Sequence, residues 1–130
     1  MSSQNPDVEY LVSERTKDLP FSDAVRVGNL LYLSGQLGLG GDGKLVEGGI
    51  AAETQQTLEN IRVTLERCGS SLDHAVKMTV MLADIGEWAD MNKIYVTYFP
   101  NHFPARSALG VSGLAFNARV EIECVAVVKG

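Results

Sequence analysis

Two neighbouring stretches of this chain differ in hydrophobic period, and that change constrains the fold more than any other feature. In residues 50–68, apolar and small side chains recur at steps of three and four, which predicts a helix with one buried stripe. In residues 74–83, apolar and polar side chains alternate, which predicts a strand with one buried face. The predicted stripe comprises Ile50, Thr54, Leu58, Ile61, Leu65 and Cys68, and the predicted strand face comprises Val76, Met78, Val80 and Leu82.

Further strands are predicted from short β-compatible runs that are bounded by turn residues. They span residues 8–12, 24–27, 30–34, 105–111 and 119–128. The dipeptide Gly28-Asn29 is a recognised two-residue turn, so the strands on either side of it are predicted to form a hairpin. Residues 35–49 hold seven glycines but lack the Gly-Lys-Ser/Thr ending of a phosphate-binding loop, so they predict a flexible connection.

A second helix is predicted over residues 85–99, where helical spacing returns. Its predicted buried stripe comprises Trp88, Met91, Tyr95 and Tyr98. The elements then follow the order β-β-β-α-β-α-β-β, with no internal repeat. This order predicts an α+β fold in which two helices pack on one face of a mixed sheet. The chain has 130 residues, the size of one domain, so we expect a single domain over residues 1–130.

The composition is that of an ordinary globular protein. The net charge of −5 argues against the basic surface of a nucleic-acid-binding protein. Cys68 and Cys124 are isolated in the sequence, and both are predicted to be reduced, buried thiols. No run approaches the roughly 18 apolar residues of a membrane span, and no secretory leader is recognisable. We therefore expect a cytoplasmic protein without membrane contact.

Arg106 and Glu121 are the residues whose chemistry most needs an explanation. Arg106 lies inside an apolar, strand-like segment, where an unpaired buried charge is costly. A guanidinium grips a carboxylate through two parallel hydrogen bonds, and a nearby Glu can orient or deprotonate water. These two residues therefore predict recognition of a small carboxylate. The structural alternatives are an ion pair of Arg106 between strands and a pairing of Glu121 with Arg119 or Lys129.

The last predicted strand has two unequal faces. Val120 and the residues at every second position after it are predicted to face the helices. The other face combines Glu121 with Val125 and Val127, and such a half-apolar surface suggests packing against another subunit. Oligomerisation would bring Arg106 and Glu121 into a cleft between subunits, which is a common place for ligand pockets.

Several short motifs follow one another along nearly the whole chain. They are Pro20-Phe21-Ser22 with Ala24-Val25 and Gly28-Asn29, Ser34-Gly35-Gln36, Val76-Lys77-Met78-Thr79-Val80 with Asp84, Asn92 with Tyr95, and Pro104-Ala105-Arg106-Ser107-Ala108-Leu109 followed by Val120-Glu121-Ile122-Glu123. Through these motifs the chain resembles the reactive intermediate deaminase family, also called the RidA/YjgF family. The motif around Arg106 is the most specific of them.

The resemblance implies a chorismate-mutase-like α+β subunit that forms a homotrimer, with sites in the clefts between subunits. It also implies an activity, the hydrolysis of 2-imino acids such as 2-iminopropanoate and 2-iminobutanoate to 2-oxo acids and ammonia. The substrate would be a small-molecule carboxylate, and neither a cofactor nor a metal is expected.

The family pattern also implies a set of site residues. Arg106 and Glu121 are the expected catalytic residues, with Arg106 holding the substrate carboxylate. The expected substrate-binding residues are Phe21, Ser34, Gly35, Asn92, Arg106 and Ala108. Backbone N–H groups near Gly35 and Ala108 would add donors toward developing charge.

Two departures from the family pattern bear on the substrate. This chain has Phe21 where deaminases of the family carry Tyr, so a phenolic hydroxyl near the site is absent. It has Ala108 where some members carry Cys or Thr. Two other functions stay open at this point: a regulatory trimer that binds 2-oxo acids without turnover, and an endoribonuclease, which the acidic balance disfavours.

Overall fold

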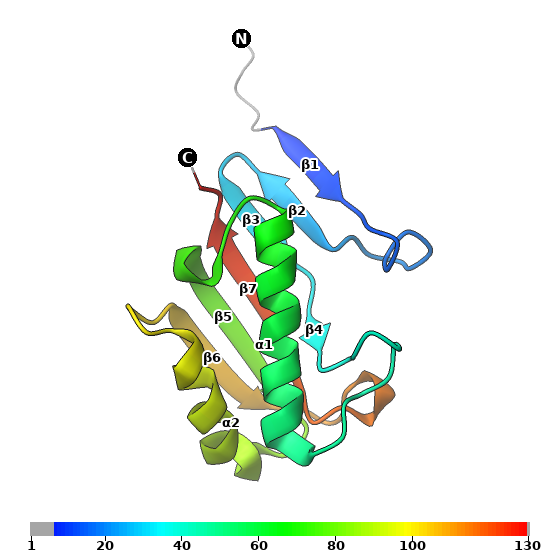
Figure 1. Ribbon diagram of the computed structural model, residues 1–130, viewed down its shortest axis with the longest axis vertical. Coiled ribbons are helices and arrows are strands. Elements are labelled where there is room, and N and C mark those ends of the chain that lie inside the picture. Colours follow the sequence, from blue (N-terminus) through cyan, green and yellow to red (C-terminus); the bar gives the residue numbers. More distant parts are fainter. Residues whose placement is uncertain (1–6, 130) are drawn as a thin grey trace.

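In the computed structural model, which describes residues 7–129, one mixed sheet carries both α-helices on the same face (Figure 1). The strands of the sheet are β1 (Val8–Leu11), β2 (Ala24–Val27), β3 (Leu30–Leu33), β4 (Gln36–Leu37), β5 (Ala75–Leu82), β6 (Ala105–Gly110) and β7 (Val120–Val127). Their order is β1-β2-β3-β7-β5-β6, and β4 also pairs with β7. Among the described strands, only β5 and β6 pair in parallel, so the predicted mixed sheet is confirmed. The predicted chorismate-mutase-like α+β fold class is confirmed with it.

The first half of the sheet is an antiparallel meander. β2 and β3 form the predicted hairpin, and its turn residue Gly28 has a φ of 59°, a left-handed conformation that favours glycine. β1 pairs with β2 along the edge. The glycine-rich segment is more ordered than the sequence predicted, because it contains β4 and a bridge between Leu39 and Leu45.

The first helix, α1, spans Gly49–Arg67 and crosses the sheet over β4 and β7 (Figure 1). Its predicted stripe is confirmed from Ile50 to Leu65, whereas Cys68 lies just beyond the helix and is only half-buried. Gly69 follows with a φ of 87°, and its backbone N–H bonds the carbonyl of Glu66, which ends the helix as a glycine C-cap does.

The strand β5 confirms the alternating pattern but not its first residue. Met78, Val80 and Leu82 are fully buried, as predicted. Val76 was predicted to lie on the same face, and this is wrong: its side chain is 43% exposed. The pairing of β5 with β7 shifts register between Ala75 and Lys77, so Val76 lies in a bulge, which turns its side chain to the other face.

The second predicted helix is broken into three pieces. A 3₁₀ turn at Ile85–Glu87 leads into α2 (Trp88–Tyr95), and a further 3₁₀ turn follows at Val96–Tyr98. Met91 and Tyr95 are buried as predicted. Trp88 was predicted to be a core residue, and this is wrong, because its side chain is 43% exposed.

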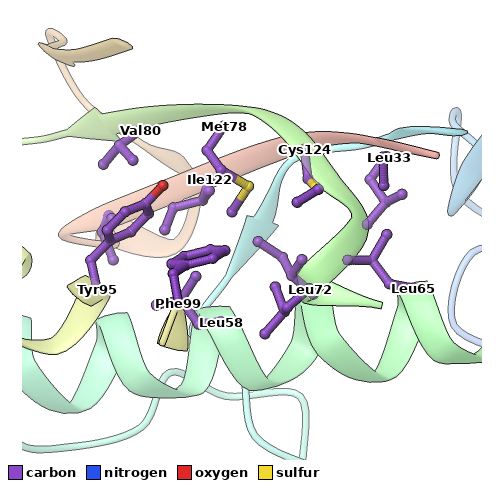
Figure 2. Packing of buried hydrophobic residues seen from close by; sticks show 14 of the residues in the cluster. Leu33, Leu58, Leu65, Leu72, Met78, Val80, Tyr95, Phe99, Ile122 and Cys124 are labelled. Carbon is purple, nitrogen blue, oxygen red and sulfur yellow. The ribbon is translucent and has the colours of Figure 1, made fainter. Parts of the chain in front are cut away.

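The core lies between the sheet and the two helices. Figure 2 shows Leu58 and Leu65 of α1 packed against Met78, Ile122 and Cys124 of the central strands. The predicted alternation of β7 is confirmed, because Val120, Ile122, Cys124 and Ala126 are buried. Both cysteines are free thiols, as predicted. No helix within residues 7–129 has the length and apolar character needed to cross a membrane.

The other face of the sheet carries neither helix and is rich in apolar side chains. Tyr32 pairs with Val125 in the register of β3 and β7, and Leu30 pairs with Val127. The exposed large apolar side chains contributed by this face include Val8, Tyr10, Leu30, Tyr32, Val76 and Leu109. We call this surface the open face.

Candidate functional site

Arg106 projects from β6 toward the helix-covered face of the sheet. In the parallel pairing of β5 and β6, it lies beside Met78, which is fully buried against the helices. Its Nη1 donates a hydrogen bond of 2.6 Å to Oδ1 of Asn92 on α2. Its Cζ lies 4.8 Å from the ring centroid of Tyr95 and 5.5 Å from that of Trp88. One amide and two aromatic rings therefore fix the guanidinium.

This arrangement leaves the charge of Arg106 without a counter-ion among residues 7–129. Arginines 15, 62, 67 and 119 all form ion pairs, but within residues 7–129 no carboxylate lies within ion-pair distance of Arg106. The predicted alternative of an ion pair between strands is therefore not observed. A guanidinium held by a neutral amide and by ring faces keeps most of its N–H donors for an external anion.

Glu121 projects toward the open face. It lies opposite Leu37 of β4 and Met81 of β5, and its chain neighbours Val120 and Ile122 are fully buried on the other side. Burial raises the pKa of the Glu121 carboxyl, and the nearby charge of Glu123 adds to the same shift. A carboxyl with a raised pKa is a better proton acceptor once it is ionised.

Arg119 does not pair with Glu121. Its guanidinium bonds Oε2 of Glu87 at 2.8 Å, and its backbone N–H bonds Oε1 of Glu53, also at 2.8 Å. Glu53 is 95% buried and links α1 to the start of β7. The predicted alternative of a Glu121–Arg119 pair is therefore not observed, because Arg119 bonds Glu53 and Glu87 instead.

The remaining predicted site residues fall into two groups. Ala108 lies two residues beyond Arg106 and is half-buried on the same face. Gly35 is in contact with the carboxylate of Glu121. Ser34 precedes Gly35, and its hydroxyl donates a 2.7 Å hydrogen bond to the carbonyl of Ser22. Phe21, next to that carbonyl, has a side chain that is 44% exposed.

One chain thus brings the predicted residues together as two half-sites on opposite faces of the sheet. The first half-site contains Arg106, Asn92 and Ala108, together with the rings of Trp88 and Tyr95. The second half-site contains Phe21, Ser34, Gly35 and Glu121. Strand β5 separates Arg106 from Glu121, so these two side chains do not meet within a single chain.

Sequence reasoning missed the contact that Trp88 and Tyr95 make with Arg106. Both were predicted as core residues because aromatic side chains at helical spacing usually are. The signal that could have revealed their role is their spacing to Asn92: positions 88, 92 and 95 share one helix face.

In the described part of the chain, no three His, Cys, Asp or Glu side chains gather as a metal site requires. An open hollow of about 480 Å³ lies at the other end of β7 from Glu121, lined by His74, Val76, Phe103 and Val127 among others. It contains none of the predicted site residues.

Comparison with known proteins places this arrangement in a family. The family described as Endoribonuclease L-PSP matches residues 14–128. The chain belongs to this family. A member of the conserved Rid protein family from Yersinia pestis, YyfA, has a crystal structure that superposes with a TM-score of 0.88 at 36% identity, covering 94% of this chain and all of that one. The predicted membership of the RidA/YjgF family is confirmed.

Curated relatives of known name are similarly close in sequence. The 2-iminobutanoate/2-iminopropanoate deaminase of Homo sapiens is 44% identical over 109 residues, which cover 83% of this chain and 80% of that protein. Protein HMF1 of Saccharomyces cerevisiae is 44% identical over 106 residues, which cover 82% of each chain.

Proposed function

We propose that this protein hydrolyses 2-imino acids, such as 2-iminopropanoate or 2-iminobutanoate, to 2-oxo acids and ammonia. The observation that carries the proposal is Arg106, a fixed guanidinium without a carboxylate partner among the described residues. Its unused donors suit the carboxylate that every 2-imino acid carries. The names of relatives such as the human deaminase support the same reaction class.

The reaction needs water, a fixed substrate and proton transfer. Arg106 holds the substrate carboxylate, and this places the adjacent C=N carbon for attack and lowers the entropic part of the barrier. The water oxygen bonds that carbon while the C=N π electrons move to nitrogen, which takes a proton. The resulting carbinolamine loses ammonia as its hydroxyl proton leaves and the C=O bond forms. The 2-oxo acid and ammonia together account for the imino acid and one water.

Glu121 orients the attacking water and accepts its proton in this proposal. It is the acidic residue that matches the family motif and also lies beside a backbone segment of the second half-site. In our proposal Ser34 and the backbone at Gly35 and Ala108 line the site. Phe21 forms an apolar wall, and Asn92 acts through Arg106, to which its amide oxygen is bonded.

We propose further that the complete site lies between copies of this chain in a homotrimer. The two half-sites point away from each other across the sheet, so Arg106 of one copy would have to meet Glu121 of the next. The apolar open face, with Tyr32 and Val125, supports self-association, since such surfaces are rarely left in water. The number three comes from the family resemblance, and light scattering across a dilution series tests it.

Mixing two impaired variants tests the shared site directly. Arg106→Ala and Glu121→Ala chains should each retain only a small fraction of wild-type activity alone. If they are unfolded and refolded together in equal amounts, about one quarter of the sites in a closed ring receive both intact residues. Recovery of about that share of wild-type activity is expected. No recovery, with mixed oligomers demonstrated by mass spectrometry, would show that each site is built by one chain.

The reaction itself is tested in a coupled assay. An amino-acid oxidase generates the 2-imino acid, semicarbazide competes for it, and slower semicarbazone formation reports hydrolysis. Arg106→Ala should lower kcat/KM by about 10- to 100-fold, the value of a charge-assisted hydrogen bond. Arg106→Lys keeps the charge but not the fork and should recover only part of it. Arg62→Ala is the control, because Arg62 pairs with Glu59 and Glu66 on the outside of α1.

The same assay separates catalysis from mere binding. If Glu121→Ala retains both binding of 2-oxo acids and full imine hydrolysis, Glu121 has no catalytic role and a binding protein becomes the better reading. If the wild type accelerates the hydrolysis of no 2-imino acid over a range of amino acids, the proposed reaction is wrong.

We also propose a cytoplasmic location. The free thiols of Cys68 and Cys124 suit a reducing compartment. Fractionation of cells that express the full chain tests this point.

A further inference from the structure

Gly35 and Glu121 approach each other more closely than a side chain at position 35 would permit. A Cβ placed on Gly35 would overlap Oε2 of Glu121, and it would lie 2.9 Å from Cδ and 3.1 Å from Cγ of the same residue. All three of the nearest atoms belong to Glu121. The carboxylate of Glu121 therefore occupies the volume that any other residue type at position 35 would fill.

We infer that Gly35 is a positioning residue for Glu121: its missing side chain creates the seat that holds the carboxylate over the backbone between β3 and β4. The inference deepens the proposed function and rests on it, since it concerns where the water-directing carboxylate is held. It differs from a role of Gly35 in substrate binding, because the contact in question is with another side chain of the same chain.

The seat is part of the sheet. β4 pairs with β7 in antiparallel register, with Gln36 opposite Ile122 and Leu37 opposite Glu121. Gly35 directly precedes this paired segment, so the backbone under the carboxylate is fixed by two strands. If the carboxylate is pushed out of this seat, the backbone at Gly35 cannot move with it unless the pairing of β4 with β7 breaks.

The seat also explains the electrostatic state of Glu121. From β4 and β5, the residues facing it are Leu37 and Met81, which carry no charge. On β7 itself the charged neighbours are Glu123 and Arg119, and the guanidinium of Arg119 is bonded to Glu87. Among the described residues of its own chain, the carboxyl thus loses water without gaining a cation, and burial followed by the charge of Glu123 raises its pKa.

The backbone itself does not require glycine at position 35. The described glycines with left-handed φ values are Gly28, Gly43, Gly48, Gly49 and Gly69. Gly35 is outside this set, so alanine is compatible with its backbone. Backbone strain is therefore not the cause of any effect of Gly35→Ala, and the Glu121→Asp background tests whether the effect comes from the encounter with Glu121. Gly41→Ala is the matched control, because Gly41 also lacks a left-handed φ and its added Cβ meets nothing within 4 Å.

The test compares Gly35→Ala, Glu121→Asp, the double variant and Gly41→Ala. Displacing the carboxylate by about 1 Å should lower kcat on a 2-imino acid by about 10- to 100-fold. Gly41→Ala should match the wild type. Aspartate is one methylene shorter, so it removes the overlap with Oε2 and leaves only contacts near 3 Å, and Gly35→Ala should therefore cost less in the Glu121→Asp background than in the wild type. Losses that simply multiply in the double variant would overturn the inference.

A second readout does not depend on activity. Carbon NMR of labelled glutamate side chains follows the titration of Glu121 in each variant. Gly35→Ala should lower the pKa of Glu121 toward the ordinary value, because the displaced carboxylate moves into water. Gly41→Ala should leave the pKa unchanged. An unchanged pKa in Gly35→Ala would defeat the inference even if the rate fell.

These measurements separate the two proposals. A wild type without imine hydrolysis would reject the proposed function, while the titration would still decide whether Gly35 seats Glu121. If Gly35→Ala fails to fold, the double variant should fold, because its shorter side chain relieves the overlap. A double variant that is equally unfolded would show that the clash is not with Glu121.

Discussion

Replacing Tyr95 by Phe should stabilise this protein, although Tyr95 is a buried residue beside the proposed site. The ring of Tyr95 packs 4.8 Å from that of Phe99 and carries Arg106 on its face (Figure 2 labels both rings). Its hydroxyl is buried and bonds no group among the described residues. Burial also raises the pKa of Tyr95 to about 12, so the hydroxyl stays protonated at neutral pH.

The magnitude follows from the cost of an unsatisfied buried hydroxyl. Such a group costs about 1–3 kcal/mol, whereas phenylalanine keeps the ring and its packing. We expect Tyr95→Phe to raise the free energy of unfolding by about 1 kcal/mol, which corresponds to a rise in Tm of about 3–5 °C for a chain of this size. Because the ring remains under Arg106, imine hydrolysis should change by less than about 3-fold.

Tyr98→Phe is the matched control for this experiment. The Tyr98 hydroxyl donates a 2.9 Å hydrogen bond to Glu59, and its pKa is also raised to about 12. Losing that bond should destabilise the protein by about 0.5–1.5 kcal/mol. The two tyrosines thus have similar pKa values, but replacing them by Phe should change the free energy of unfolding in opposite directions.

Urea unfolding followed by circular dichroism measures both effects. All variants must be compared at one protein concentration, because self-association adds to apparent stability. If Tyr95→Phe loses 1 kcal/mol or more, about the value of a hydrogen bond, the hydroxyl has a partner in the folded protein. The view of Tyr95 as a ring platform alone would then be refuted.

Three further predictions concern stability. Leu58→Ala should lower the free energy of unfolding in urea by about 2–5 kcal/mol because Leu58 is fully buried. Val63 is 48% exposed, so Val63→Ala should lower it by less than about 1 kcal/mol. Equal losses would contradict the assigned face of α1. Asp23→Asn removes the 3.2 Å ion pairs with Arg15 and Arg67 and should lower Tm, by less in high salt; an unchanged Tm would show that these pairs contribute nothing. The raised pKa of Glu121 means that its ionised form is less favourable in the folded state, so its contribution to stability is complete in acid and is lost as pH rises through the folded pKa. Glu121→Gln should therefore be more stable than the wild type at neutral pH but not in acid. A gain in stability at both pH values would contradict this cause.

Local periodicity predicted most of the elements because each long element repeats its signal several times. The stripe of α1 and the alternation of β5 both extend over many residues, and both were located to within one or two residues. Short or interrupted elements were lost for the same reason. β4 has only two residues in a glycine-rich run, and α2 is flanked by 3₁₀ turns that keep helical spacing without a continuous helix.

The identity of the site residues could be read from motifs, but their contacts could not. The sequence singled out Arg106, Asn92 and Glu121 one by one. It did not predict that Asn92 would bond Arg106, or that Trp88 would lie beside the guanidinium rather than in the core. Those contacts depend on how α2 is placed against β6, and packing of distant segments decides this.

By itself, the sequence determined where the helices and strands form and that an arginine stands in an apolar strand. Only the tertiary structure decided on which face of the sheet Arg106 lies and where the alternation of a strand breaks. The physical reason is the two-residue period of a strand: pairing with distant strands sets which positions face the helices, and one bulge, as at Val76, reverses that assignment. Arg106 and Glu121 therefore lie on opposite faces, and Glu121 meets Gly35, a residue far from it in the chain.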